Sequence, residues 1–291
     1  NSTDNVLRGN VGTPVVAWST VNSLNQARTS TSGAGIATAA LVVGGYSTTN
    51  IADTESWNGS NWTEVNNLNT ARSSTGSMGT YTAALTFGGS GSPSYLANTE
   101  TWNGTNWTEV NDLNSARRAL PGAGTNTAGL AIGGFEPPGT NKVESWNGTN
   151  WTETTDLNTP RYASAGAGIQ TAALLIGGAG GTPKTELWNG SNWTEVNDLN
   201  QGREALMGSG VQTSAVAYGG TTPAGAATES WNGTNWTEVN DLNNGRIRAA
   251  SAGATNTSAL ASGGVPAPGS PDNVALVEQF AGLTTKTFTT S

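Results

Sequence analysis

Residues 57–65 have the sequence Trp-Asn-Gly-Ser-Asn-Trp-Thr-Glu-Val. Nearly the same sequence begins again at Trp102, Trp146, Trp188 and Trp231. An Asn-Gly pair flanked by strand-forming residues is the strongest short-range signal for a β-hairpin. Whether the loop has two residues or four, the register places Trp57 and Trp62 on the same face, where aromatic side chains stabilise a sheet. The repeated unit is therefore predicted to contain a hairpin held by two tryptophans.

Other markers recur at the same interval as the hairpin. The second Trp of each unit, an Arg that follows a Leu-Asn pair, and a Gly-Gly pair each occur six times. The second Trp falls at positions 18, 62, 107, 151, 193 and 236, so that the units are 42 to 45 residues long. This is the length of a four-stranded propeller blade.

Each unit contains the pattern of four strands. A Gly/Ser-rich segment such as residues 73–79 is the expected innermost strand, because only small side chains fit where blades converge. Residues 82–87 form a continuous apolar run, typical of a strand buried on both faces. The third strand is expected to carry Glu55 and Trp57, and the fourth Trp62 and Glu64.

The two ends of the chain contain complementary halves of one unit. Trp18 has the surroundings of a fourth strand but no third strand before it, whereas the last unit ends after a third strand that has Phe280 at the first Trp position. Pairing these strands closes a ring and removes exposed sheet edges. The prediction is an all-β, six-bladed propeller of four-stranded antiparallel blades over residues 14–291, preceded by an arm or linker over residues 1–13. A linear solenoid is the alternative, but it leaves Trp18 unpaired and lacks polar capping units.

Composition excludes several functions. The chain has 291 residues, 40 Gly, no Cys and no His, so that thiol chemistry and imidazole ligands or bases are absent. Its net charge of −8 argues against nucleic acid as a partner. No apolar run is long enough to cross a bilayer as a helix, so membrane insertion is not expected.

The marker pattern resembles the Kelch-type β-propeller family. The matching residues are Gly88-Gly89 after the second strand, Trp102 on the third, Trp107 on the fourth and Arg117 at the start of the next unit. Trp replaces the Tyr that this family usually has on the third strand. The repeats are also rich in Asn and Thr, with the sequence Trp-Asn-Gly-Thr-Asn-Trp-Thr-Glu-Val-Asn-Asp-Leu-Asn. This sequence is similar to repeats in virion and surface proteins of aquatic bacteria and their tailed phages.

The repeated charged and aromatic residues are interpreted as structural. With a four-residue loop, Glu55 lies opposite Glu64, and an Arg such as Arg72 between them would relieve the repulsion. A site present in every blade suits an ion pair better than catalysis, which needs one site. The residues assigned to this structural group are Trp57, Trp62, Trp102, Trp107, Arg72, Arg117, Glu55 and Glu100.

Catalytic and metal sites are not expected. The acidic residues outside the repeat positions show no special pair for glycoside hydrolysis. The Asp-box of sialidases is absent, and the His and Cys ligands of Kelch-type copper-radical oxidases are missing. Asn-Asp-Leu-Asn lacks the spacing of a calcium loop. No cofactor is predicted, and the ten Asn-x-Ser/Thr sequons of the tryptophan hairpins are explained by turn formation.

The units differ mainly between the Gly-Gly pair and the Glu, and at the residues just after the Arg. Both segments belong to connections that leave a four-stranded blade on the same face, and variable loops on a rigid scaffold are where binding residues concentrate. Neutral drift of unconstrained loops is the alternative explanation. The candidate binding residues are Tyr46, Tyr95, Phe135, Glu136, Arg118, Tyr162 and Arg248.

These observations predict a non-enzymatic structural or recognition propeller. The expected role is a phage virion component, such as a tail, fibre or capsid-surface protein, that serves in host attachment. Its expected partners are other virion or surface proteins and a host-surface glycan or protein. The alternative is a secreted or cell-surface bacterial propeller for carbohydrate binding or adhesion. Either role places the protein on a virion, outside the cell or on the cell surface.

Overall fold

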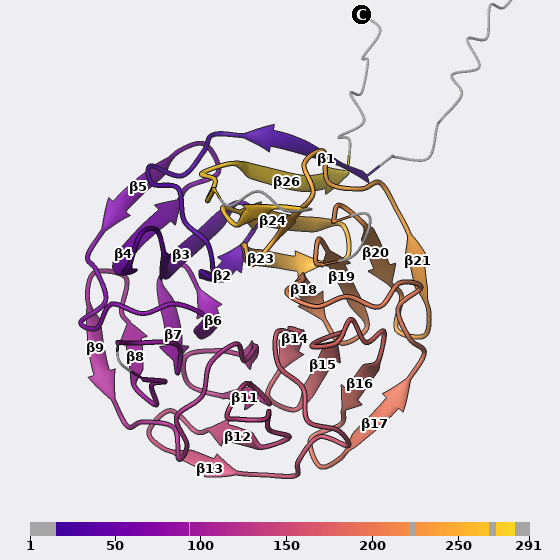
Figure 1. Ribbon diagram of the computed structural model, residues 1–291, viewed down its shortest axis with the longest axis horizontal. Helices are drawn as coiled ribbons and strands as arrows, with labels where there is room; N and C mark the ends of the chain where they lie inside the picture. Colours follow the sequence, from indigo (N-terminus) through magenta and orange to yellow (C-terminus); the bar gives the residue numbers. More distant parts are fainter. Residues whose placement is uncertain (1–15, 93, 222–224, 268–271, 283–291) are drawn as a thin grey trace, which may run out of the picture.

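The computed structural model describes residues 16–92, 94–221, 225–267 and 272–282. Six sheets of four antiparallel strands each are arranged in a ring around a central axis (Figure 1). The predicted arm over residues 1–13 lies outside the described residues. The predicted six-bladed, all-β propeller is thus confirmed.

The blades are numbered along the chain, with strands given from the axis outward. Blade 1 comprises β2 (Ser32–Ile36), β3 (Ala39–Tyr46), β4 (Asn50–Trp57) and β5 (Trp62–Val65). Blade 2 comprises β6 (Gly76–Thr80), β7 (Ala83–Phe87), β8 (Thr99–Trp102) and β9 (Trp107–Val110). Blade 3 comprises β10 (Gly122–Gly124), β11 (Gly129–Ile132), β12 (Val143–Trp146) and β13 (Trp151–Glu153).

The second half of the ring follows the same plan. Blade 4 comprises β14 (Ala165–Ile169), β15 (Ala172–Ile176), β16 (Thr185–Trp188) and β17 (Trp193–Val196). Blade 5 comprises β18 (Met207–Val211), β19 (Ser214–Tyr218), β20 (Thr228–Trp231) and β21 (Trp236–Glu238). Blade 6 comprises β23 (Ala250–Thr255), β24 (Ser258–Ser262), β26 (Val277–Gly282) and β1 (Val16–Val21). A short ribbon pairs β22 (Arg246–Ile247) with β25 (Val265–Pro266).

Blade 6 closes the ring with strands from both ends of the chain. Strand β1 pairs antiparallel with β26, and Trp18 lies opposite Phe280 with 5.0 Å between ring centroids. Trp18 also packs 4.8 Å from Tyr218 of blade 5. The N-terminal strand therefore completes the blade that the C-terminal unit leaves short, as the sequence predicted.

The tryptophan hairpin has a four-residue loop. Trp57 pairs directly with Trp62, and their ring centroids lie 5.2 Å apart. In the loop, the Asn58 carboxamide oxygen accepts hydrogen bonds from the backbone N–H groups of Ser60 and Asn61, each at 2.9 Å. This side chain closes the turn and explains why Asn recurs there.

The apolar core lies between the blades. One cluster joins Leu85 and Phe87 of blade 2 to Trp146 and Trp151 of blade 3. Both Leu85 and Phe87 are fully buried, because the second strand of a blade is covered on each side by a neighbouring blade. Burial on both faces accounts for the continuous apolar run in the sequence.

A hydrogen bond reinforces most of the junctions between blades. The indole Nε1–H of Trp107 donates to Oγ1 of Thr54 in the preceding blade at 3.1 Å. The same bond is made by Trp18, Trp151 and Trp236 to Thr228, Thr99 and Thr185. At the two remaining junctions the position of the Thr is occupied by Val143 or Val277.

These two valines leave two indole groups without a partner. The Nε1–H groups of Trp62 and Trp193 are buried and donate to no acceptor among the described residues. Trp62 packs in one cluster with Val277, and Trp193 packs in one cluster with Val143. A buried donor without an acceptor destabilises a protein by about 1–3 kcal/mol.

Val277→Thr and Val143→Thr should therefore each stabilise the protein by about 1 kcal/mol, because the new hydroxyl accepts the indole N–H. Urea denaturation followed by tryptophan fluorescence measures the change. Val216→Thr is the matched control, since Val216 is equally buried but faces no unpaired indole. This control should be destabilised. If all three variants lose stability equally, the unpaired indole groups do not matter.

Candidate functional site

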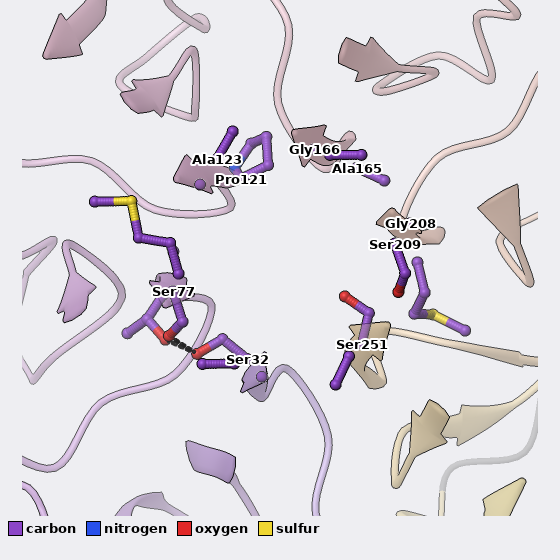
Figure 2. A pocket seen from close by; sticks show the side chains of 18 of the residues that line it. Ser32, Ser77, Pro121, Ala123, Ala165, Gly166, Gly208, Ser209 and Ser251 are labelled. Atoms are coloured by element: carbon purple, nitrogen blue, oxygen red, sulfur yellow. Dashed lines mark hydrogen bonds between the residues drawn. The ribbon is translucent and has the colours of Figure 1, made fainter. Parts of the chain in front are cut away.

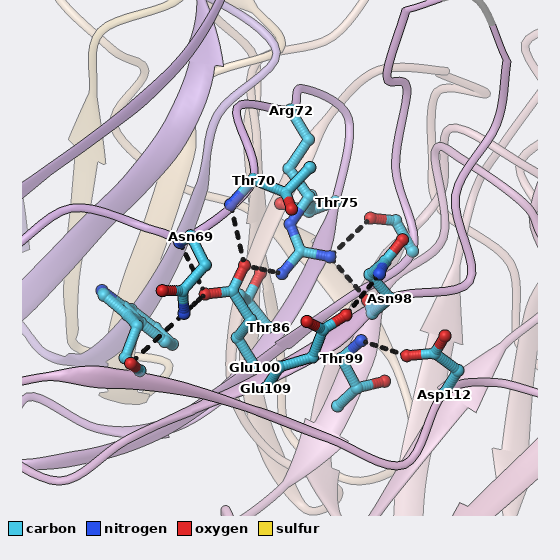
Figure 3. A network of polar contacts seen from close by, with 12 residues as sticks. Asn69, Thr70, Arg72, Thr75, Thr86, Asn98, Thr99, Glu100, Glu109 and Asp112 are labelled. Atoms are coloured by element: carbon cyan, nitrogen blue, oxygen red, sulfur yellow. Dashed lines mark hydrogen bonds and ion pairs between the residues drawn. The ribbon is translucent and has the colours of Figure 1, made fainter.

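Each connection that enters a blade is fastened by a buried glutamate. In blade 2, Oε1 of Glu100 accepts from Nη2 of Arg72 at 2.8 Å. Oε2 of Glu100 accepts from the backbone N–H and the side-chain amide of Asn69, at 2.8 and 2.7 Å. Figure 3 shows the two donors on either side of the carboxylate. Both oxygens of a buried charge are therefore satisfied.

The same arrangement of a buried Glu bound by an Arg and an Asn, which we call the clamp, is present in all six blades. The pairs are Arg28–Glu55, Arg72–Glu100, Arg117–Glu144, Arg161–Glu186, Arg203–Glu229 and Arg246–Glu278. In each, the Asn three residues before the Arg binds the second carboxylate oxygen, as Asn25 does for Glu55. These contacts fit a structural interpretation of the repeated Arg and Glu residues.

One detail of the predicted pairing is wrong. Glu55 does lie opposite Glu64. However, Arg72 binds Glu100 of its own blade, and Glu55 binds Arg28. The reason is that each Arg lies just before the innermost strand and folds over the third strand of the blade that it enters. Glu64 is exposed and the charge of Glu55 is neutralised by Arg28, so that the two glutamates need no Arg between them.

Burying the charged groups of the clamp is unfavourable unless they are paired. Burial lowers the pKa of the Arg72 guanidinium, and the nearby Glu100 carboxylate opposes that shift. The pKa values of Arg161, Arg203 and Arg246 are lowered for the same reason, each opposed by its partner glutamate. Each charge thus depends on its partner to remain buried.

Arg72→Ala should destabilise the protein by about 3–5 kcal/mol, because Glu100 would remain buried without its cation. The double variant Arg72→Met/Glu100→Gln should lose much less, since Gln still accepts from Asn69 and no charge is left unpaired. Urea unfolding curves of the two variants provide the comparison. Equal losses would show that the ion pair is not what fixes the connection.

A closed ring of backbone hydrogen bonds surrounds the axis. The residue two positions after each clamp Arg has a positive φ, between 51° and 56°. Each of these residues donates its N–H to the carbonyl of its equivalent in the preceding blade, at 2.7–3.0 Å. The members of this hub ring are Ser30, Ser74, Ala119, Ala163, Ala205 and Arg248.

The hub ring borders a central channel with a volume of about 250 Å³. Figure 2 shows the small side chains that surround it, including Ser32, Ser77 and Ser251. Ser32 and Ser77 are hydrogen-bonded at 2.7 Å. Of the described residues that line the channel, Arg248 is the only charged one, and none is a carboxylate.

Four of the seven candidate binding residues meet at one place on the face that carries the variable loops. The Phe135 ring makes edge-to-face contacts with Tyr95 and Tyr162, at centroid distances of 5.9 and 4.8 Å. The Arg118 guanidinium lies 5.0 Å from the Phe135 centroid and 5.3 Å from that of Tyr95. All four side chains are partly exposed. We call them the aromatic–arginine cluster.

The scaffold fixes the position of this cluster. Arg118 directly follows the clamp residue Arg117, and its backbone pairs with that of Phe135 through N–H···O contacts of 2.7 and 3.3 Å. Tyr162 likewise follows Arg161. Gly139 lets the loop approach Tyr162, because a Cβ there would lie 3.3 Å from the ring. The cluster thus joins loops of blades 2, 3 and 4.

The other three candidates lie apart from the cluster. Tyr46 is 43% exposed at the end of β3 and makes no ring contact with a described residue. Glu136 pairs with Lys142 at 3.3 Å. Arg248 belongs to the hub ring, on the opposite side of the axis from blade 3.

Most of the positively charged side chains in the described part of the chain are paired with a carboxylate, but two are not. Eight Lys and Arg side chains form ion pairs with Asp or Glu. Among the described residues, Arg118 and Arg248 are the two that do not. Both are on the variable-loop face, although the protein as a whole carries a net charge of −8.

Two structural features were not assigned from the sequence. The clamp Asn, such as Asn69, could have been found from its recurrence after Leu in every unit. The hub ring has no such signal, because positive φ is favoured by Gly and Asn, whereas these positions hold Ser, Ala and Arg.

No protein-family model matches this sequence, and no curated protein is significantly similar to it. Within the described part of the chain, no helix is long and apolar enough to span a membrane. The described residues also contain no group of three or more His, Cys, Asp or Glu side chains that could hold a metal ion.

Proposed function

We propose that this protein is a Kelch-like, non-enzymatic recognition propeller that a phage carries on its virion, as a tail, fibre or capsid-surface component, for host attachment. The observation that supports it best is the aromatic–arginine cluster on the variable-loop face. Its partly exposed rings and unpaired cation are residue types that are enriched where proteins bind partners.

The contrast between scaffold and loops supports recognition. The clamps, the tryptophan hairpins and the hub ring are repeated around the molecule, whereas the cluster occurs in one place. A rigid scaffold holds its binding groups in position before the partner arrives, which lowers the entropic cost of binding. Attachment to a surface needs such a preformed site and no chemical step.

The distribution of carboxylates supports a non-enzymatic role. The third-strand glutamates are neutralised in the clamps, and those of the outermost strands, such as Glu64 and Glu109, are exposed at the rim. No carboxylate lines the described part of the channel. Glycoside hydrolysis requires two carboxyl groups that face one another across a substrate site.

The virion assignment comes from the Asn/Thr-rich repeats, which resemble those of phage and bacterial surface proteins. Antibodies raised against the purified protein should label phage particles from the source sample in immunogold electron microscopy. Labelling of bacterial envelopes in place of particles would favour the alternative, a cell-surface adhesion propeller.

Attachment is tested with fluorescently labelled protein on host cells. Phe135→Ala should reduce cell binding at least ~10-fold, because Phe135 contacts the three other members of the cluster. Tyr81→Ala is the matched control, since Tyr81 is an exposed aromatic residue, 45% accessible, on the opposite face. Equal binding by both variants would argue against attachment through the cluster.

A further inference from the structure

We propose that the aromatic–arginine cluster binds a carboxylated sugar, such as a uronic or sialic acid residue of an acidic surface glycan. This inference rests on the proposed recognition function and names the chemistry of its ligand. It follows from three properties of the cluster: an unpaired guanidinium, the aromatic rings beside it, and the acidic character of the rest of the protein.

Arg118 has its hydrogen-bonding capacity unused. Its guanidinium donates to no described residue, and its Nε is buried without a partner. Every clamp arginine, by contrast, binds a glutamate. A guanidinium presents its N–H groups in a planar fork that matches a carboxylate. Because Nε is buried, the two Nη groups of Arg118 form the edge that suits an incoming carboxylate.

The rings hold this fork in place and add an apolar surface. Tyr95 and Phe135 attract the Arg118 guanidinium through cation–π contacts at 5.3 and 5.0 Å from the ring centroids, which help to hold it in position. Phe135 and Tyr162 are packed edge to face, so that the rings form a preformed surface. A ligand that fits the cluster has an anionic group for Arg118 and, beside it, a compact apolar face for the rings. The C–H face of a pyranose is such an apolar face. Tyrosine hydroxyls can bind sugar hydroxyls.

The charge of the protein argues against a nucleic acid as the ligand of the cluster. With a net charge of −8, the protein repels a nucleic acid, whose binding requires a basic stripe along its backbone. Arg118 and Arg248 are the unpaired cations of the described residues, and they belong to blades on opposite sides of the axis. The cluster thus offers one cation with aromatic neighbours, which suits a sugar acid.

The test measures binding of defined oligosaccharides by isothermal titration calorimetry. Oligogalacturonate and oligosialate should bind, whereas maltohexaose should bind at least ~10-fold more weakly, because it lacks the charge that Arg118 recognises. A sulfated dextran oligomer separates carboxylate from sulfate recognition. Tighter binding of the sulfated oligomer, or equal binding of neutral and carboxylated sugars, would overturn the proposal.

Variants locate the site. Arg118→Gln should weaken binding of the carboxylated oligomers ~10–100-fold, and Arg118→Lys ~5-fold or more, since Lys keeps the charge but loses the fork. Arg248→Asn is the matched control: it also removes one unpaired cation, Asn tolerates its positive φ, and binding should change less than ~2-fold. Thermal melting of each variant checks folding. Equal losses for Arg118→Gln and Arg248→Asn would show a general charge effect and overturn the assignment.

The same variants separate this proposal from the proposed function. If Arg118→Gln still attaches to host cells while Phe135→Ala does not, attachment stands and recognition of a carboxylated sugar is wrong. If the oligomers bind through Arg118 but the protein does not attach to cells, the ligand class stands and the attachment role is wrong.

Discussion

The buried glutamate on the third strand of each blade is the interaction on which the rest of the propeller depends. Its two oxygens bind an Asn and an Arg of the connection that enters the blade. Because both donors are on one short segment, the path of that segment across the blade is fixed. The residues directly after the Arg are therefore held in place as well. This places Arg118 and Tyr162 toward the variable loops, and the following residue in the hub ring.

The hub ring shows how six blades meet at a small radius. Positive φ is unfavourable for a residue with a side chain, by about 1–2 kcal/mol. Each hub residue also gains a backbone hydrogen bond to its neighbour, and the six bonds form a closed circle. The Gly-Gly pairs complete this packing: a Cβ on Gly88 would lie 2.6 Å from the carbonyl oxygen of Arg117 in the next blade. Close backbone contact thus explains why glycine recurs there.

The sequence was sufficient to predict the fold, because a propeller repeats one local pattern. Hairpins, strand order and the pairing of Trp18 with Phe280 all follow from spacing. The partner of Arg72 was not predicted correctly, since spacing does not say over which blade a connection folds. The aromatic–arginine cluster was predicted only as separate residues. Tyr95, Phe135 and Tyr162 are on three different connections, and their contact depends on loop conformations that no periodic signal encodes.

The closing ladder of blade 6 has a mechanical consequence. Val16 pairs with Gly282, so that the first and last described residues lie at the same end of the β1–β26 ladder. A force that pulls these two residues apart loads the hydrogen bonds of this ladder one after another, as in a zipper, rather than all together in shear. Peeling β26 away instead would break its ladders with both β1 and β24, so that β1 separates first. Under tension applied through both ends, the joint that closes the circle is therefore the first to yield.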